Sequence, residues 1–91
     1  MTLDIAHDRA RGRVETFVEG QHCALDYERQ GDVMIVTHVV VPRPVEGRGI
    51  AAALTKFALD AARAEGLRVV PQCPYAAHYM ERHPEYEDLR A

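Results

Sequence analysis

Two glycines between an apolar run and an alanine-rich segment form the first candidate site. The segment Glu46-Gly47-Arg48-Gly49-Ile50-Ala51-Ala52 follows a run of valines and two prolines. Glycines let a backbone come close to a ligand, and the first turn of a helix carries N–H groups without partners and partial positive charge. We therefore predict a pyrophosphate site at the N–H groups of residues 47–52, with Arg43 and Arg48 adding positive charge.

The same glycines also fit a plain strand-to-helix turn in which they only relieve backbone strain, because short glycine motifs often match by chance. The loop lacks the Gly-Lys-Ser/Thr ending of a Walker loop, and it lacks the third glycine of the dinucleotide-binding fingerprint. The glycine pattern alone leaves both interpretations open.

Cys73, in the segment Pro71-Gln72-Cys73-Pro74-Tyr75, is a candidate nucleophile or acyl acceptor. It precedes the predicted start of a helix, where the dipole and free N–H groups favour a thiolate and so lower the pKa of a thiol. The alternative is a small buried residue that fills space, which is the commoner role of a lone cysteine.

His38 is a candidate general base, because histidine is the residue type that most often serves as a general base near neutral pH. It lies within an apolar run, where strand alternation places it on one face with Met34, Val36 and Val40. The alternative is a buried histidine that hydrogen-bonds a neighbouring carbonyl, since burial without such a partner is unfavourable.

Tyr75, Tyr79 and Arg82 follow helical spacing and are expected to line one groove. A metal site is not expected. His78 and His83 are five residues apart and do not share a helix face, and the two cysteines, Cys23 and Cys73, match no Cys-x-x-Cys spacing.

The elements that would position these residues can be predicted from periodicity and breakers. Residues 13–18 and 21–28 alternate as a hairpin around Glu19-Gly20, and residues 33–41 are expected to form a strand buried on both faces. A helix is expected from about 49 to 65, a short strand at 67–70 and a second helix from Pro74 to His83-Pro84. The expected order is ββββαβα, an α+β fold in which an antiparallel β-meander precedes helix–strand–helix.

Size and composition are those of one globular domain over residues 1–91. Apolar residues make up 47% of the chain, and a net charge of -3 gives no reason to expect nucleic-acid binding. No apolar run is long enough for a membrane span, and the N-terminus lacks the features of a signal peptide. We therefore expect a cytoplasmic protein with reduced thiols and no membrane partner.

Taken together, the motifs resemble the small, single-domain N-acetyltransferase-like family of the GNAT superfamily. The resemblance covers roughly residues 13–89 and includes Thr37-His38-Val39-Val40-Val41-Pro42, the glycine loop with its helix, Pro71-Gln72-Cys73-Pro74-Tyr75 and Arg82-His83-Pro84-Glu85-Tyr86. The Pro-x-Cys-Pro-Tyr and His-Pro-Glu-Tyr pieces are far more specific than the glycine loop.

The resemblance implies a reduced GNAT fold that binds acetyl-coenzyme A. The backbone of Val39, Val40 and Val41 would pair with the pantetheine arm, and the glycine loop would hold the pyrophosphate. Cys73 would lie close to the thioester sulfur, with His38 facing the same site, and Tyr75, Tyr79 and Arg82 are counted among the cofactor-binding residues. Glu46 departs from the family pattern, which has Gln or Arg there. At about 5 Å from a phosphate, its charge would cost on the order of 3 kcal/mol before screening by salt.

The leading hypothesis is acetyl transfer from acetyl-coenzyme A to a primary amine of a small molecule or a protein. In a direct route His38 takes the proton of the amine, and in a covalent route Cys73 accepts the acetyl group first and His38 activates it. The alternative is a non-catalytic module that senses acetyl-coenzyme A or binds another protein. A chain of 91 residues gains stability from pairing, so a monomer or a weak homodimer is expected.

Overall fold

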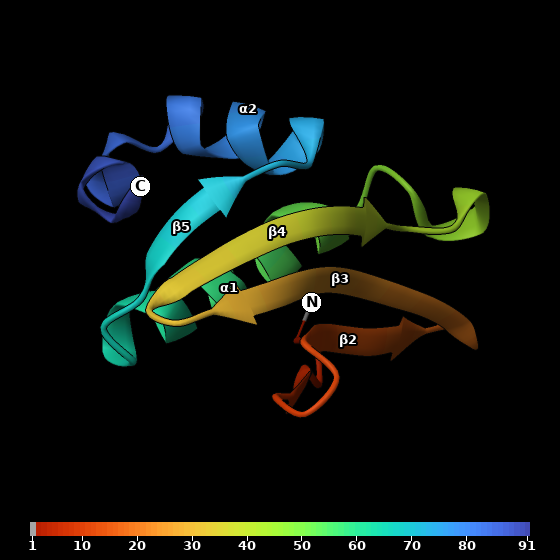
Figure 1. Cartoon of the computed structure of the whole chain (residues 1–91). Helices are drawn as coiled ribbons and strands as arrows, with labels where there is room; N and C mark the ends of the chain where they lie inside the picture. Colours follow the sequence, from red (N-terminus) through yellow and green to blue (C-terminus); the bar gives the residue numbers. More distant parts are fainter. Residues whose placement is uncertain (1) are drawn as a thin grey trace.

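A sheet of five strands in chain order forms one layer of the computed structural model, which describes residues 2–91. The strands are β1 (Ala6–Asp8), β2 (Arg13–Val18), β3 (Gln21–Gln30), β4 (Val33–Val40) and β5 (Arg68–Pro71). The first four pair antiparallel, and β5 pairs parallel to β4 after the chain crosses over through α1 (Ile50–Ala64). In Figure 1, α1 lies behind the sheet, and α2 (Pro74–Arg82) lies beyond β5.

The expected order ββββαβα and the α+β class are confirmed. The Glu19-Gly20 turn joins β2 to β3, and α1 begins after Gly49, as the breakers indicate. The three-residue strand β1 was not placed by residue from the sequence, because it is too short to show alternation. Two 3₁₀ helices complete the fold, η1 (Arg43–Val45) before the glycine loop and η2 (Pro84–Leu89) at the C-terminus.

The hydrophobic core lies between α1 and one face of the sheet. Leu54 and Ala58 of α1 are fully buried, as are Leu25 and Val36 of the sheet. The opposite face is more open, and Val40 is 57% exposed there. The prediction that residues 33–41 are buried on both faces is therefore wrong, because α1 covers a single face (Figure 1).

A β-bulge near the end of β4 changes which side chains share a face. Tyr27 pairs with Val36 while the preceding Asp26 pairs with His38, so Thr37 is an extra residue on β4. Cross-strand partners lie on the same face. His38 therefore lies with Asp26 on the open face, and the prediction that it shares a face with Met34 and Val36 is wrong.

No helix within residues 2–91 has the length and apolar character needed to cross a membrane.

Candidate functional site

The site begins where β4 and β5 separate. Their pairing ends at Val36 and Pro71, and the Cys73 N–H then donates to the Val36 carbonyl at 2.9 Å as the chain turns into α2. Residues 37–40 continue along β3, but no strand within residues 2–91 pairs with their other edge. That edge offers backbone groups to an extended ligand, in the manner of an added strand.

The glycine loop follows, and its amides have no backbone partners. Gly47 and Gly49 have φ values of 76° and 78°, in the left-handed region that only glycine adopts freely. Within residues 2–91, the N–H groups of residues 47–52 donate to no backbone carbonyl, and the first to do so is that of Ala53, to Gly49 at 3.0 Å. A Cβ on either glycine would meet nothing within 4 Å. The glycines are thus required by backbone conformation, and the space beside them is open to an anion.

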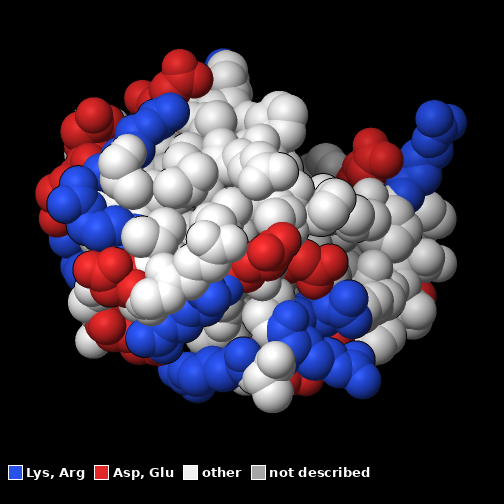
Figure 2. Space-filling view, in the orientation of Figure 1, with Lys and Arg blue, Asp and Glu red and all other residues white. Residues whose placement is uncertain are grey.

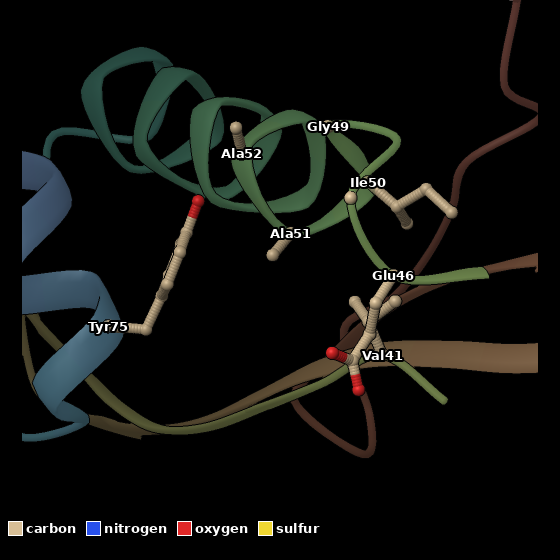
Figure 3. A pocket seen from close by; sticks show the side chains of 8 residues that line it. Val41, Glu46, Gly49, Ile50, Ala51, Ala52 and Tyr75 are labelled. Carbon is tan, nitrogen blue, oxygen red and sulfur yellow. The ribbon is translucent and has the colours of Figure 1, made fainter. Parts of the chain in front are cut away.

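A cavity of about 270 Å³ adjoins this loop. It is bounded by the end of β4, the start of α1 and the start of α2, and its lining residues are Val41, Glu46, Gly47, Gly49, Ile50, Ala51, Ala52 and Tyr75. Figure 3 shows the Tyr75 ring reaching toward α1 beside Ala52, whereas the Glu46 carboxylate lies next to Val41. Its volume is smaller than that of a typical pocket for a drug-sized ligand, so it accommodates one short segment of a larger ligand.

Positive charge at the loop is largely compensated. Nη1 and Nη2 of Arg48 donate to the Glu19 carboxylate at 2.5 and 3.4 Å, and the Arg48 side chain does not line the cavity. The hydrogen bond from Arg48 lowers the pKa of Glu19, so this pair stays ionised. Arg43 is exposed in η1, and Glu46 adds a negative charge to the cavity wall. The amides of the loop are therefore its main attraction for an anion.

The two predicted catalytic residues lie outside the cavity lining. Cys73 is a free thiol at the N-terminus of α2, only 7% exposed and part of the hydrophobic core cluster. His38 is exposed on the open face, with its Nδ1 3.1 Å from Thr37 Oγ1. Both residues lie just beyond the point where β4 and β5 separate: His38 on β4 and Cys73 after β5.

The predicted groove on α2 is present only at Tyr75. Tyr79 is buried, and its ring stacks on His83 with centroids 3.8 Å apart. Arg82 is exposed and does not line the cavity. Of the three valines assigned to the pantetheine, Val39 packs on the core, Val40 is exposed and Val41 lines the cavity.

Sequence reasoning missed Thr37 as the bulged residue and Glu19 as the partner of Arg48. The bulge has no residue-type signal. Glu19 at a hairpin turn was a clue, since Asn or Gly is the usual residue there. Among residues 2–91, no group of three His, Cys, Asp or Glu side chains is placed to hold a metal ion.

Comparison with known proteins agrees with this geometry. Residues 13–89 match the family model described as GCN5-related N-acetyl-transferase. Protein NATD1 of Homo sapiens is 35% identical over 85 residues, covering 90% of this chain and 75% of that protein. Protein NATD1 of Danio rerio is 32% identical over 89 residues, covering 92% and 81%.

A solved structure shares the fold. The NMR solution structure of a GCN5-like protein from Staphylococcus aureus superposes with a TM-score of 0.76 at 18% identity, covering 97% of this chain and 87% of that one. The family model spans most of the chain, and both the sequence relatives and the fold agree with it. The chain therefore belongs to the family of GCN5-related N-acetyltransferases.

Proposed function

We propose that the protein binds acetyl-coenzyme A, with the pyrophosphate on the amides of residues 47–52 and the pantetheine arm along the open edge of residues 37–40. The observation that supports this most is the run of backbone N–H groups without backbone acceptors beside an uncrowded pair of glycines. An anion with several oxygens would satisfy these groups, and the α1 dipole favours its charge. The residues present thus fit the cofactor through their backbone.

The chemistry we propose is acetyl transfer to a primary amine. The amine nitrogen attacks the thioester carbonyl carbon, the C–S bond breaks, and coenzyme A leaves as the thiolate. The proton released by the amine passes to His38, directly or through water, and from His38 to the departing thiolate, which becomes the thiol. His38 is accessible for this because it is exposed on the open face of the sheet, and Figure 2 shows an uncharged area in the upper middle of this face. A small amine or a protein lysine could approach this open face.

In the covalent route, Cys73 is the first acceptor of the acetyl group and His38 activates it. The Cys73 thiolate would take the acetyl group from coenzyme A and then pass it to the amine. Mixing the protein with acetyl-coenzyme A should then add one acetyl group to the intact mass, and Cys73→Ser should lose it. A Cys73→Ser protein that binds the cofactor normally and keeps the full transfer rate would exclude this route.

A non-catalytic acetyl-coenzyme A sensor is the second candidate. The observation that favours it is that neither His38 nor Cys73 lines the cavity. Titration with coenzyme A, followed by backbone NMR shifts at residues 47–52, tests both candidates together. Absence of binding at millimolar coenzyme A would remove both, whereas tight binding without acetylation of any amine in a broad panel would favour the sensor.

A further inference from the structure

Glu19 has an unusual backbone conformation for its residue type. Its φ of 50° makes it the one residue other than glycine with positive φ among residues 2–91. A side chain with a Cβ costs roughly 1–2 kcal/mol there, and Asn or Gly is the low-cost choice in such a hairpin turn. A glutamate at this position therefore points to a role for its carboxylate.

That carboxylate contacts Arg48, which lies 29 residues further along the chain. Arg48 stands between Gly47 and Gly49, at the centre of an exposed loop. The loop is anchored before and after it, because Val45 is fully buried and Ile50 is 2% exposed.

Between these anchors the loop has little else to hold it. Within residues 2–91, the Glu46 N–H donates to Arg43 and the Gly49 carbonyl accepts from Ala53, but Arg48 contacts the rest of the protein through Glu19. The two glycines flanking Arg48 give the backbone freedom to move. The Glu19–Arg48 pair is thus placed to fix the centre of the loop to the β2–β3 turn.

We infer that Glu19 is a positioning residue for the anion-binding loop, holding the amides of residues 47–52 toward the cavity through Arg48. The inference rests on the proposed binding of coenzyme A for its functional meaning. Arg48, which was expected to add positive charge for the pyrophosphate, then has a different role: its side chain holds the loop and does not contact the phosphate. A loop fixed before the ligand arrives loses less conformational entropy on binding.

Glu19→Asn tests this, because asparagine tolerates the left-handed turn but cannot reach Arg48. The variant should fold with an unchanged or higher Tm, and its dissociation constant for coenzyme A should rise roughly twofold to fivefold, the range of an exposed ion pair. Its affinity for pantetheine, which lacks the pyrophosphate, should not change. Arg9→Ala, which removes the distant Arg9–Glu65 pair, is the control and should bind coenzyme A like the wild type.

A double-mutant cycle separates the positioning role from direct phosphate contact. Arg48→Ala should weaken binding as much as Glu19→Asn, and the double variant should be no weaker than either. If Arg48→Ala is far more damaging than Glu19→Asn, Arg48 contacts the phosphate and the inference is wrong.

The loop itself can be measured without a ligand. Heteronuclear ¹H–¹⁵N NOE values at Gly47 and Gly49 should fall in Glu19→Asn, while those at Gly31 and Gly66 stay the same. Unchanged values at Gly47 and Gly49 would overturn the inference. This measurement decides the role of Glu19 even if the wild type fails to bind coenzyme A, a result that would remove the proposed function instead.

Discussion

The glycine loop before α1 and the His83-Pro84-Glu85-Tyr86 segment after α2 satisfy their polar groups in opposite ways. In the segment, the Tyr86 hydroxyl donates to Asp60 Oδ1 at 2.6 Å, and His83 Nδ1 lies 2.8 Å from the Tyr79 carbonyl oxygen. In the loop, the N–H groups of residues 47–52 have no backbone acceptor within residues 2–91.

The difference shows that a sequence motif can be recognisable for a structural reason or for a ligand-binding reason. In the His-Pro-Glu-Tyr segment, the His83 and Tyr86 side chains both have hydrogen-bond partners, and the bond from Tyr86 to Asp60 joins η2 to α1. The glycine loop is less specific as a pattern, but it presents unpaired donors to a cavity. The N–H groups at the start of a helix have no intrahelical acceptor, and here they are free to bind water or an anion beside the cavity. We therefore expect changes in the segment to alter stability and changes in the loop to alter binding.

The largest expected effect is on stability, from Tyr86→Ala. The Tyr86 side chain is 5% exposed within the core, and deletion of a buried aromatic ring costs roughly 3–5 kcal/mol. Urea unfolding should show this loss. Coenzyme A affinity, measured well below the midpoint of unfolding, should stay within about twofold of wild type. A large loss of affinity in the folded variant would contradict the purely structural role of the segment.

The raised pKa of Tyr86 leads us to expect a lower free energy of unfolding at high pH. Burial and the hydrogen bond to Asp60 raise the pKa of Tyr86 from its ordinary value near 10 to about 12. Below about pH 10 both the folded and unfolded chains keep this proton, and the stabilisation is fully present. As the pH rises from about 10 to 12 only the unfolded chain loses the proton, so the free energy of unfolding should fall by on the order of 2 kcal/mol.

Tyr86→Phe is the matched control for this pH effect. Burial also raises the pKa of Tyr27, Tyr75 and Tyr79, so the wild type contains further contributions at the same pH. The difference between wild type and Tyr86→Phe isolates Tyr86. If that difference does not shrink between pH 10 and 12, the Tyr86–Asp60 hydrogen bond is not formed as described.

Gly49→Ala should weaken coenzyme A binding in addition to lowering the stability of the fold. The φ of 78° makes a Cβ unfavourable by about 1–2 kcal/mol, although no atom blocks it. Relief of that strain would turn the loop amides away from the cavity. Coenzyme A affinity should therefore fall on the order of tenfold, the equivalent of about 1.4 kcal/mol. Gly31→Ala, at φ 63° with equally open surroundings in the β3–β4 turn, should lose similar stability but no affinity.

Much of the fold could be predicted from the sequence because its signals are local. Alternation and the Glu19-Gly20 turn gave β2 and β3, and Gly49 and Gly66 bracket α1 as expected. The bulge at Thr37 was not predictable, since one extra residue leaves no mark in composition yet reverses the face of His38. The open face of β4 was also missed, because β-branched residues favour a strand whether or not both faces are buried.

In the candidate site too, only the features that depend on local sequence could be predicted. The loop amides and Tyr75 were identified and line the cavity, because their positions follow from the helix starts. Tyr79 stacks on His83 and Arg48 contacts Glu19, and neither lines the cavity, so their assignment to the ligand stays a prediction. Helical spacing predicts the helix face on which Tyr79 lies, but not the residue that it contacts there. The contact between Arg48 and Glu19 joins residues far apart in the chain, so no local pattern predicts it.

The smallest expected effect is that of replacing Glu46 on coenzyme A affinity. This carboxylate lies on the cavity wall beside a site for an anion, but it is exposed, so water and salt screen most of its repulsion. Exposed charge pairs contribute roughly 0.2–1 kcal/mol, well below the value for an unscreened pair. Glu46→Gln should therefore tighten coenzyme A binding by about twofold to fivefold at low salt.

Salt and ligand choice make this prediction specific. The gain from Glu46→Gln should shrink as ionic strength rises, because the Debye length falls to about 3 Å at 1 M. It should be absent for pantetheine, which carries no pyrophosphate charge. Weaker binding of coenzyme A to the variant at any salt would mean that the carboxylate helps to hold the loop or a cation. In that case the glycine loop would depend on its side chains as the His-Pro-Glu-Tyr segment does, and the contrast between the two regions would fail.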